Sequence, residues 1–184
     1  MKTIKTNIPE VIRLKPDVFL DERGFFMETF RTNWLPDFNF VQDNHSKSIK
    51  NTLRGLHYQL KNPQGKLVRV TQGEVFDVAV DLRLDSETYG RWTGCILNET
   101  NKELFWVPPG FAHGFLVLSE MAEFQYKCTD FYSPGDEFSI AWNDPDIAID
   151  WPCSSQPLLS KKDSDAPLLK DAAVYQKKSF EVRS

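Results

Sequence analysis

The stretch Val75-Phe76-Asp77-Val78-Ala79-Val80-Asp81-Leu82 decides the fold of this chain. Its even-numbered residues are all apolar, while its two aspartates stand at odd-numbered positions. Successive side chains of a β-strand point to opposite faces, so this alternation indicates a strand rather than a helix. One face of the predicted strand therefore packs on a core, and the other carries the two carboxylates.

Four more predicted strands follow along the chain, at residues 90–97, 103–107, 111–118 and 124–129. Short strands at regular spacing, separated by glycine and proline, are typical of a β-sandwich or β-barrel. Nothing in this stretch carries a long helical period, so a parallel βαβ fold is not expected. From Ile147 on the alternation is lost, and residues 160–163 and 166–169 predict short helical turns on the outside or at the mouth of the barrel.

The bulk composition limits the class of protein. A chain of 184 residues, 41% hydrophobic, predicts one domain over residues 1–184. The net charge of −4, without a run of lysine or arginine, argues against nucleic acid as a partner but allows a phosphorylated small molecule. No apolar run approaches the roughly 20 residues that span a bilayer, and no signal peptide is visible. Three widely spaced cysteines indicate reduced thiols in a cytoplasmic protein.

The best candidate for catalysis is the segment Arg54-Gly55-Leu56-His57-Tyr58-Gln59, followed closely by Gln64-Gly65-Lys66. It predicts two short strands joined by a turn at residues 62–65, so that His57 and Lys66 face the same cavity. An imidazole is a base near neutral pH, and an ammonium stabilises an oxyanion. The pair suits proton abstraction beside a carbonyl, and with only three histidines in the chain few others compete for the role of base.

Each of these candidates also has a structural interpretation. A lone histidine in a strand is more often structural than catalytic, and strict alternation places Arg54 and His57 on opposite faces, unless Gly55 supplies a bulge that turns both toward one pocket. Tyr126 is either a core aromatic or a proton donor in a cavity. Asp163 is either part of a solvated turn or the residue that orients His57 and stabilises its protonated form. Periodicity does not decide between these alternatives.

Two further patterns bear on ligands. Small β-barrels often bind metals through His-x-His on one strand, and His57 has no such partner, so we expect no metal centre. The segment 23–28 is by composition an edge strand. The alternative is a nucleotide contact, with an aromatic ring on the base and Arg23 on phosphate. Residues 42–46 form a polar cluster that is most simply a turn.

Taken together, several segments resemble the dTDP-4-dehydrorhamnose 3,5-epimerase family of sugar-nucleotide isomerases. The resemblance runs collinearly from residue 21 to about 170, through residues 21–26, 40–46, 53–59, 64–69, 73–81, 109–115 and 159–163. It implies an all-β, cupin-type jelly-roll barrel with short peripheral helices, a homodimer, and catalysis without a cofactor. One difference from the family pattern is Phe131, which stands where the family usually begins a pair of tyrosines.

The resemblance also implies roles for individual residues. His57 falls on the family's general base, Asp163 on its partner, Lys66 beside the keto oxygen and Tyr126 on the proton donor. The positions that match substrate binding are Arg23, Phe26, Glu28, Gln42, Asn44, Arg54, Lys66, His113, Tyr132, Glu137 and Lys162. The implied substrate is a dTDP-4-keto-6-deoxy sugar, inverted at C3 and C5 through an enolate.

Four alternatives remain at this point. A relative could invert only C3 or only C5, or could be a ketoisomerase of a related dTDP-4-keto sugar. A metal-dependent cupin oxygenase would need the His-x-His pair that is missing here. A sugar-nucleotide binding module without activity would give no reason to keep His57, Lys66, Tyr126 and Asp163 together.

Overall fold

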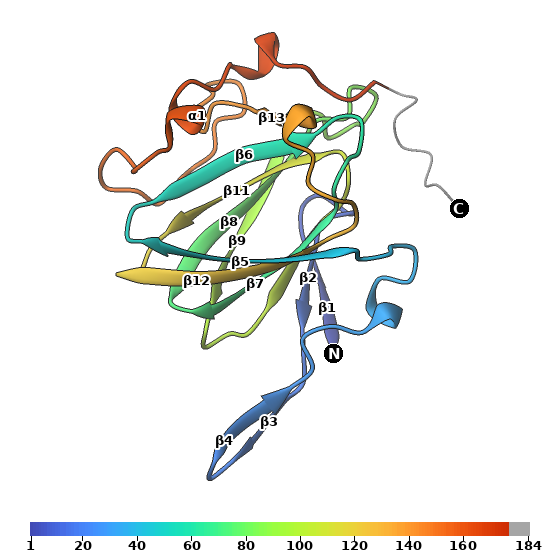
Figure 1. Ribbon diagram of the computed structural model, residues 1–184, viewed down its shortest axis with the longest axis vertical. Helices are drawn as coiled ribbons and strands as arrows, with labels where there is room; N and C mark the ends of the chain where they lie inside the picture. Colours follow the sequence, from blue (N-terminus) through green and yellow to red (C-terminus); the bar gives the residue numbers. More distant parts are fainter. Residues whose placement is uncertain (177–184) are drawn as a thin grey trace.

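Two antiparallel β-sheets face one another in the computed structural model, which describes residues 1–176 (Figure 1). The six-stranded sheet has the order β1 (Lys2–Lys5), β2 (Ile12–Lys15), β10 (Leu104–Val107), β7 (Lys66–Gln72), β12 (Met121–Cys128), β5 (Gln42–Ile49). The five-stranded sheet has the order β13 (Glu137–Ser139), β6 (Leu53–Gln59), β11 (Phe111–Val117), β8 (Glu74–Asp81), β9 (Trp92–Asn98). The expected all-β, cupin-like barrel is confirmed.

The remaining elements are short. A separate hairpin pairs β3 (Val18–Asp21) with β4 (Gly24–Met27). The helical turns are η1 (Thr32–Trp34), η2 (Pro134–Asp136), α1 (Lys161–Ser164) and η3 (Leu169–Asp171). The first predicted turn, at residues 160–163, is confirmed by α1, whereas η3 shares only Leu169 with the second predicted turn at residues 166–169. α1 contacts β6 at the end of the molecule opposite the hairpin (Figure 1). Among residues 1–176, no helix is long and apolar enough to cross a membrane.

The two faces of β8 pack against different parts of the molecule. Its odd-numbered apolar residues, Val75 and Ala79, belong to the core between the two sheets. Its even-numbered ones, such as Val78 and Val80, pack outside the five-stranded sheet against the C-terminal segment. Both faces are therefore buried, and the aspartates at the odd positions are fully buried as well.

The strands on either side of the turn at residues 62–65 are confirmed, but they are not neighbours in one sheet. β6 pairs with β11 and β13, whereas β7 pairs with β10 and β12. The turn carries the chain from one sheet to the other, so His57 and Lys66 come from sheets that face each other. Two strands joined by a short connection most often pair with each other. β6 and β7 do not, because each of them pairs with two other strands instead.

The predicted bulge at Gly55 is also confirmed. His113 of β11 lies opposite His57, and Phe115 lies opposite Arg54, so β6 carries one residue more than its partner between these pairs. An extra residue reverses the alternation, which allows Arg54 and His57 to share the inner face. Gly55 itself has a φ of +125°, a conformation that side chains rarely adopt.

Substituting Gly55 by alanine is expected to destabilise the fold by roughly 3 kcal/mol or more, because strain at positive φ adds to overpacking. A Cβ at this position would lie 2.5 Å from the Cα of Gly114 and 2.7 Å from the carbonyl oxygen of His113. Gly135→Ala is the matched control, since a Cβ there meets nothing within 4 Å. Urea unfolding of both variants measures the difference, and equal midpoints for the two would contradict the prediction.

Several contacts hold the C-terminal segment against β6 and β8. Leu158 and Tyr175 form parallel bridges with Thr52 and Arg83. The buried carboxylate of Asp144 accepts a hydrogen bond of 2.6 Å from the backbone N–H of Leu169. These attachments lie on both sides of α1 in the chain, so they fix α1 over β6.

Candidate active site

The site begins with a histidine and an aspartate that the fold brings together from positions 106 residues apart. Nε2 of His57, on β6, lies 2.5 Å from Oδ1 of Asp163, on α1. The side chain of Asp163 is only 3% exposed, while that of His57 is 24% exposed and so remains accessible. The structure therefore places Asp163 beside His57, a contact that the spacing of residues in the sequence does not predict.

The charges of this pair follow from its surroundings. Burial lowers the pKa of His57, although the hydrogen bond and charge of Asp163 oppose the shift. Burial alone would raise the pKa of Asp163, but hydrogen bonds from His57 and Ser160 keep it below its ordinary value. Near neutral pH, Asp163 is therefore an anion and His57 is neutral. The shared proton then sits on Nε2, which leaves the lone pair of Nδ1 to act as a base.

Lys66, at the start of β7, places an ammonium group in the interior. Burial lowers its pKa, and the thiol of Cys128 and the carboxylates of Glu137 and Asp77 oppose the shift. The charge of Lys66 also acts on His57 and lowers its pKa. A cation held in a region with little water interacts strongly with any negative charge that develops nearby.

Tyr126, on β12, comes from the sheet opposite His57. Its ring packs against the core between the sheets, beside Phe124. Burial raises the pKa of Tyr126, and the nearby groups of Cys128 and Glu137 raise it further, while Arg54 opposes them. The phenol is therefore protonated near neutral pH, and it is available as a proton donor on the side of the cavity away from β6.

His113 sits beside His57 on the neighbouring strand β11. Its Nε2 lies 2.9 Å from Oδ1 of Asp77, and both side chains are buried. The ring of His113 stacks on Phe124. The histidine is thus held by a carboxylate on one side and an aromatic face on the other.

A second group of polar side chains connects α1, β13 and β5 with the segment before η2. The Lys162 ammonium lies 2.6 Å from one carboxylate oxygen of Glu137, and the Tyr132 hydroxyl donates to the other at 2.9 Å. The backbone N–H of Tyr132 donates to the side chain of Gln42, which in turn donates to Asn44. Five of the expected substrate-binding residues therefore form one connected network.

Arg54 is exposed and bridges the two sheets. Its Nε donates a hydrogen bond of 2.9 Å to the hydroxyl of Ser48 on β5, in the six-stranded sheet. The guanidinium acts electrostatically on Tyr126, so it lies on the same side of β6 as the groups described above. It supplies a fixed positive charge that can bind a phosphate.

Three expected site residues are not brought to this place within the chain. Arg23 and Phe26 lie on the β3–β4 hairpin, which projects from the end of the molecule far from α1 (Figure 1), and Glu28 follows it. Arg23 pairs with its neighbour Asp21 at 2.7 Å, and Phe26 is 68% exposed. The interpretation of residues 23–28 as an edge strand is confirmed by β4. The interpretation of residues 42–46 as a turn is wrong, because these residues belong to β5 and pair with β12.

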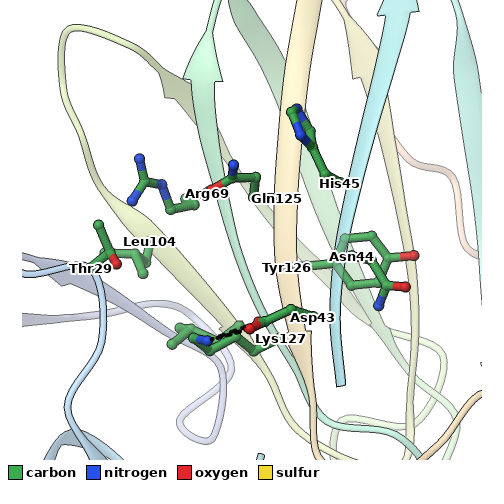
Figure 2. Close-up of a pocket in the computed structure, with 10 residues that line it drawn as sticks. Thr29, Asp43, Asn44, His45, Arg69, Leu104, Gln125, Tyr126 and Lys127 are labelled. Carbon is green, nitrogen blue, oxygen red and sulfur yellow. Dashed lines mark hydrogen bonds and ion pairs between the residues drawn. The ribbon is translucent and has the colours of Figure 1, made fainter. Parts of the chain in front are cut away.

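A pocket of about 390 Å³ opens elsewhere, against β5, β7 and β12 (Figure 2). Arg69, Gln125 and Lys127 lie along it, at positions that alternate with those facing the interior. In Figure 2, Tyr126 points away from Arg69 and Gln125. The lining of the pocket includes Asn44 and Tyr126 but none of His57, Lys66 and Asp163, so the His57–Asp163 pair lies outside it.

Sequence reasoning missed three partners of the site, the buried residues Asp77 and Ser48 and the exposed Ser160. The sequence pattern places Asp77 on a strand face without assigning it a role, and it assigns no role to Ser48 or Ser160. Ser160 had a signal, because a serine three residues before an acidic residue is typical of a helix N-cap. The partners of Asp77 and Ser48 lie on other strands, and no local pattern predicts them.

Among residues 1–176, no three histidine, cysteine or acidic side chains are grouped so that they could bind a metal.

The family model described as dTDP-4-dehydrorhamnose 3,5-epimerase matches residues 5–171. The chain is 57% identical over 182 residues to the protein of that name from Salmonella typhimurium, covering 96% of this chain and 100% of the relative. It is 58% identical over 167 residues to the one from Neisseria gonorrhoeae, covering 89% of this chain and only 51% of that longer relative.

Solved structures agree with the sequence matches. The epimerase RmlC from Legionella pneumophila, in complex with dTDP-4-keto-L-rhamnose, has a TM-score of 0.91 and 54% identity, covering 94% of each chain. A 3'-monoepimerase from Streptomyces bikiniensis, in complex with dTDP-quinovose, has a TM-score of 0.89 and 31% identity, covering 95% of this chain and 93% of that one. The fold is thus similar to that of a protein named for two inversions and of one named for a single inversion.

Proposed function

The chain belongs to the dTDP-4-dehydrorhamnose 3,5-epimerase family, and we propose that His57 and Tyr126 perform the two proton transfers of this reaction. The enzyme epimerises dTDP-4-dehydro-6-deoxy-D-glucose at C3 and C5 to give dTDP-4-dehydro-L-rhamnose, within dTDP-L-rhamnose biosynthesis. The observation that carries the residue roles is the contact of 2.5 Å between His57 and the buried carboxylate of Asp163, in an interior shared with Lys66 and Tyr126.

The chemistry follows from the ketone at C4, which acidifies the hydrogens at C3 and C5. Nδ1 of His57 removes one of these protons, and the C–H electron pair moves into an enolate with its charge on the C4 oxygen. Asp163 stabilises the imidazolium that forms. Lys66 stabilises the enolate oxygen in the water-poor interior.

Inversion requires that the new proton arrive on the face opposite the one it left. Tyr126 and His57 come from opposite sheets, which suits one to remove a proton and the other to donate. After Tyr126 donates, its phenolate is stabilised by the charge of Arg54, which opposes the rise that burial causes in the pKa of this phenol. Each inversion then ends when solvent restores the proton of Tyr126 and takes the one on His57.

The polar network that connects α1, β13 and β5 suits the nucleotide part of the substrate. Lys162 and Arg54 supply positive charge for the diphosphate, and Gln42, Asn44 and Tyr132 offer hydrogen bonds and an aromatic face.

We place the reaction in the cytoplasm, because all three cysteines are free thiols.

The decisive test is incubation with dTDP-4-dehydro-6-deoxy-D-glucose in deuterated water, followed by NMR at C3 and C5. We expect deuterium at both carbons and conversion to the L-lyxo ketosugar. Exchange without conversion of either centre, or no exchange at all, would refute the proposal.

The second candidate is a mono-epimerase, since a 3'-monoepimerase has the same fold at 31% identity. The same experiment separates the two, because a mono-epimerase incorporates deuterium with inversion at one carbon only. The identities of more than half to proteins named as 3,5-epimerases favour two inversions.

A homodimer explains the remote position of Arg23, Phe26 and Glu28. The β3–β4 hairpin exposes Phe19, Leu20, Phe25 and Phe26 to between 55% and 78%, which is costly for an isolated chain and typical of a docking element. We propose that the hairpin of one protomer reaches the site of its partner, so that each site combines residues from two chains.

Subunit mixing tests this arrangement. Arg23→Ala and His57→Asn protomers, each of low activity alone at substrate concentrations below KM, are co-expressed with different tags and the mixed dimer is purified. If the hairpin crosses between protomers, one of its two sites is intact and about half the wild-type activity returns. If each chain supplies its own Arg23, both sites stay defective and no activity returns.

A further inference from the structure

The hydroxyl of Ser160 makes two hydrogen bonds, both to Asp163. It donates to Oδ2 of Asp163 at 2.8 Å, and it accepts from the backbone N–H of Asp163 at 3.1 Å. The first bond takes up the carboxylate oxygen that His57 does not use. The second makes Ser160 the N-cap of α1. One small side chain therefore holds both the backbone and the carboxylate of the residue that contacts His57.

We propose that Ser160 is a positioning residue for catalysis, which orients the Asp163 carboxylate and keeps it ionised, and thereby sets the basicity of His57. The inference rests on the proposed role of His57 and extends it by one residue. Ser160 contacts neither His57 nor the substrate in this account, so its whole effect passes through Asp163.

The physical reason lies in the burial of Asp163. A carboxylate that is 3% exposed loses its hydration and stays ionised only if hydrogen bonds replace the water. His57 donates to Oδ1 and Ser160 donates to Oδ2, so both oxygens have a donor. Consistently, the hydrogen bond from Ser160 contributes to the lowered pKa of Asp163.

Orientation is the second part of the effect. A carboxylate can rotate about its Cβ–Cγ bond, and a single donor at Oδ1 does not stop this rotation. With Oδ2 fixed by Ser160, Oδ1 remains directed at Nε2 of His57. The tautomer with a free lone pair on Nδ1 depends on this contact.

The other charged or titratable groups around His57 do not depend on Ser160. They come from α1, from the facing sheet, from β13 and from the neighbouring strand; they are Lys162, Lys66, Glu137 and His113. Because both hydrogen bonds of the Ser160 hydroxyl go to Asp163, a change at Ser160 alters the environment of His57 through Asp163.

Kinetics of Ser160 variants provide the first test. We expect Ser160→Ala to lower kcat about tenfold, as for loss of a hydrogen bond to a charged group, with KM unchanged. Because a less ionised Asp163 stabilises the imidazolium less, the acid limb of the kcat profile moves to lower pH. Ser160→Thr keeps the hydroxyl and is expected to restore both quantities. Ser164→Ala is the matched control, since this serine of the same helix donates to the carbonyl of Lys161 instead.

Two further variants separate this role from simple capping of α1. Glycine is nearly as good an N-cap as serine, so a purely structural role predicts near-normal kcat for Ser160→Gly, whereas we expect the same loss as for Ser160→Ala. In the Asp163→Asn background, Ser160→Ala should cause no further loss, because residues that act through one another are not additive. An independent loss in the double variant would overturn the proposal.

An NMR titration makes the test independent of turnover. The chain has only three histidines, so the ring signal of His57 is identified by its absence in His57→Asn. Ser160→Ala is expected to lower the pKa of His57, and Ser164→Ala to leave it unchanged. If the wild-type protein fails to epimerise the sugar, the proposed function falls, and this titration still tests the coupling. An unchanged His57 titration in Ser160→Ala would overturn the inference whatever the activity.

Discussion

The His57→Asn variant is expected to lose both epimerisation and deuterium exchange, with kcat reduced by about a thousandfold or more. General base catalysis contributes about 10² to 10⁴ in rate, and an asparagine retains the hydrogen-bonding shape of the ring without a basic nitrogen. Both inversions begin with proton removal, so a missing base affects both carbons equally. The measurement is kcat together with the exchange rate at C3 and C5 in deuterated water.

The His57→Asn variant is expected to fold normally. Asparagine can still donate to Asp163, so its buried carboxylate keeps a partner and thermal unfolding should change little. His45→Asn is the matched variant, because His45 lies on the outward face of β5 and pairs with Glu123 at 3.3 Å. We expect full activity for His45→Asn. Exchange at wild-type rates in His57→Asn would show that another group removes the proton.

The strands of the barrel could be predicted from local pattern, and their partners could not. Alternating or short apolar runs, bounded by glycine, proline and polar turns, located β8 through β12 to within a few residues, because each of these strands packs at least one face on the core. The separation of β6 and β7 into different sheets leaves no local trace. Which sheet each strand joins depends on how well it pairs with strands elsewhere in the chain, and this is set by the whole fold.

The same distinction holds for the site. The bulge at Gly55 could be inferred because two functional residues on one strand needed the same face. The contact between His57 and Asp163 joins residues 106 positions apart. Local pattern leaves this contact as one of two alternatives for Asp163, and only the resemblance to the family favours it. Asp77 acts from the strand beside that of His113, and Ser48 acts from the sheet opposite that of Arg54, so both positions are set by the complete sheets. Ser160 alone carried a local signal, in its spacing from Asp163.

The Tyr126→Phe variant is expected to separate exchange from inversion. His57 still removes a proton and returns a deuteron to the same face, so the substrate gains deuterium without changing configuration. Inversion needs a donor on the other face, and its rate should fall by about 10² to 10⁴. Product NMR in deuterated water measures both processes in one experiment.

Tyr89→Phe is the control for this substitution, because Tyr89 packs against the cluster outside the five-stranded sheet. Loss of its hydroxyl should leave both rates unchanged. If Tyr126→Phe lost exchange as completely as inversion, Tyr126 would be needed for proton removal, and the assignment of opposite faces would be wrong. Comparison with His57→Asn therefore shows which residue removes the proton and which one donates it. Loss of the base stops both exchange and inversion, whereas loss of the acid stops only inversion, because only inversion needs a proton from the β12 side.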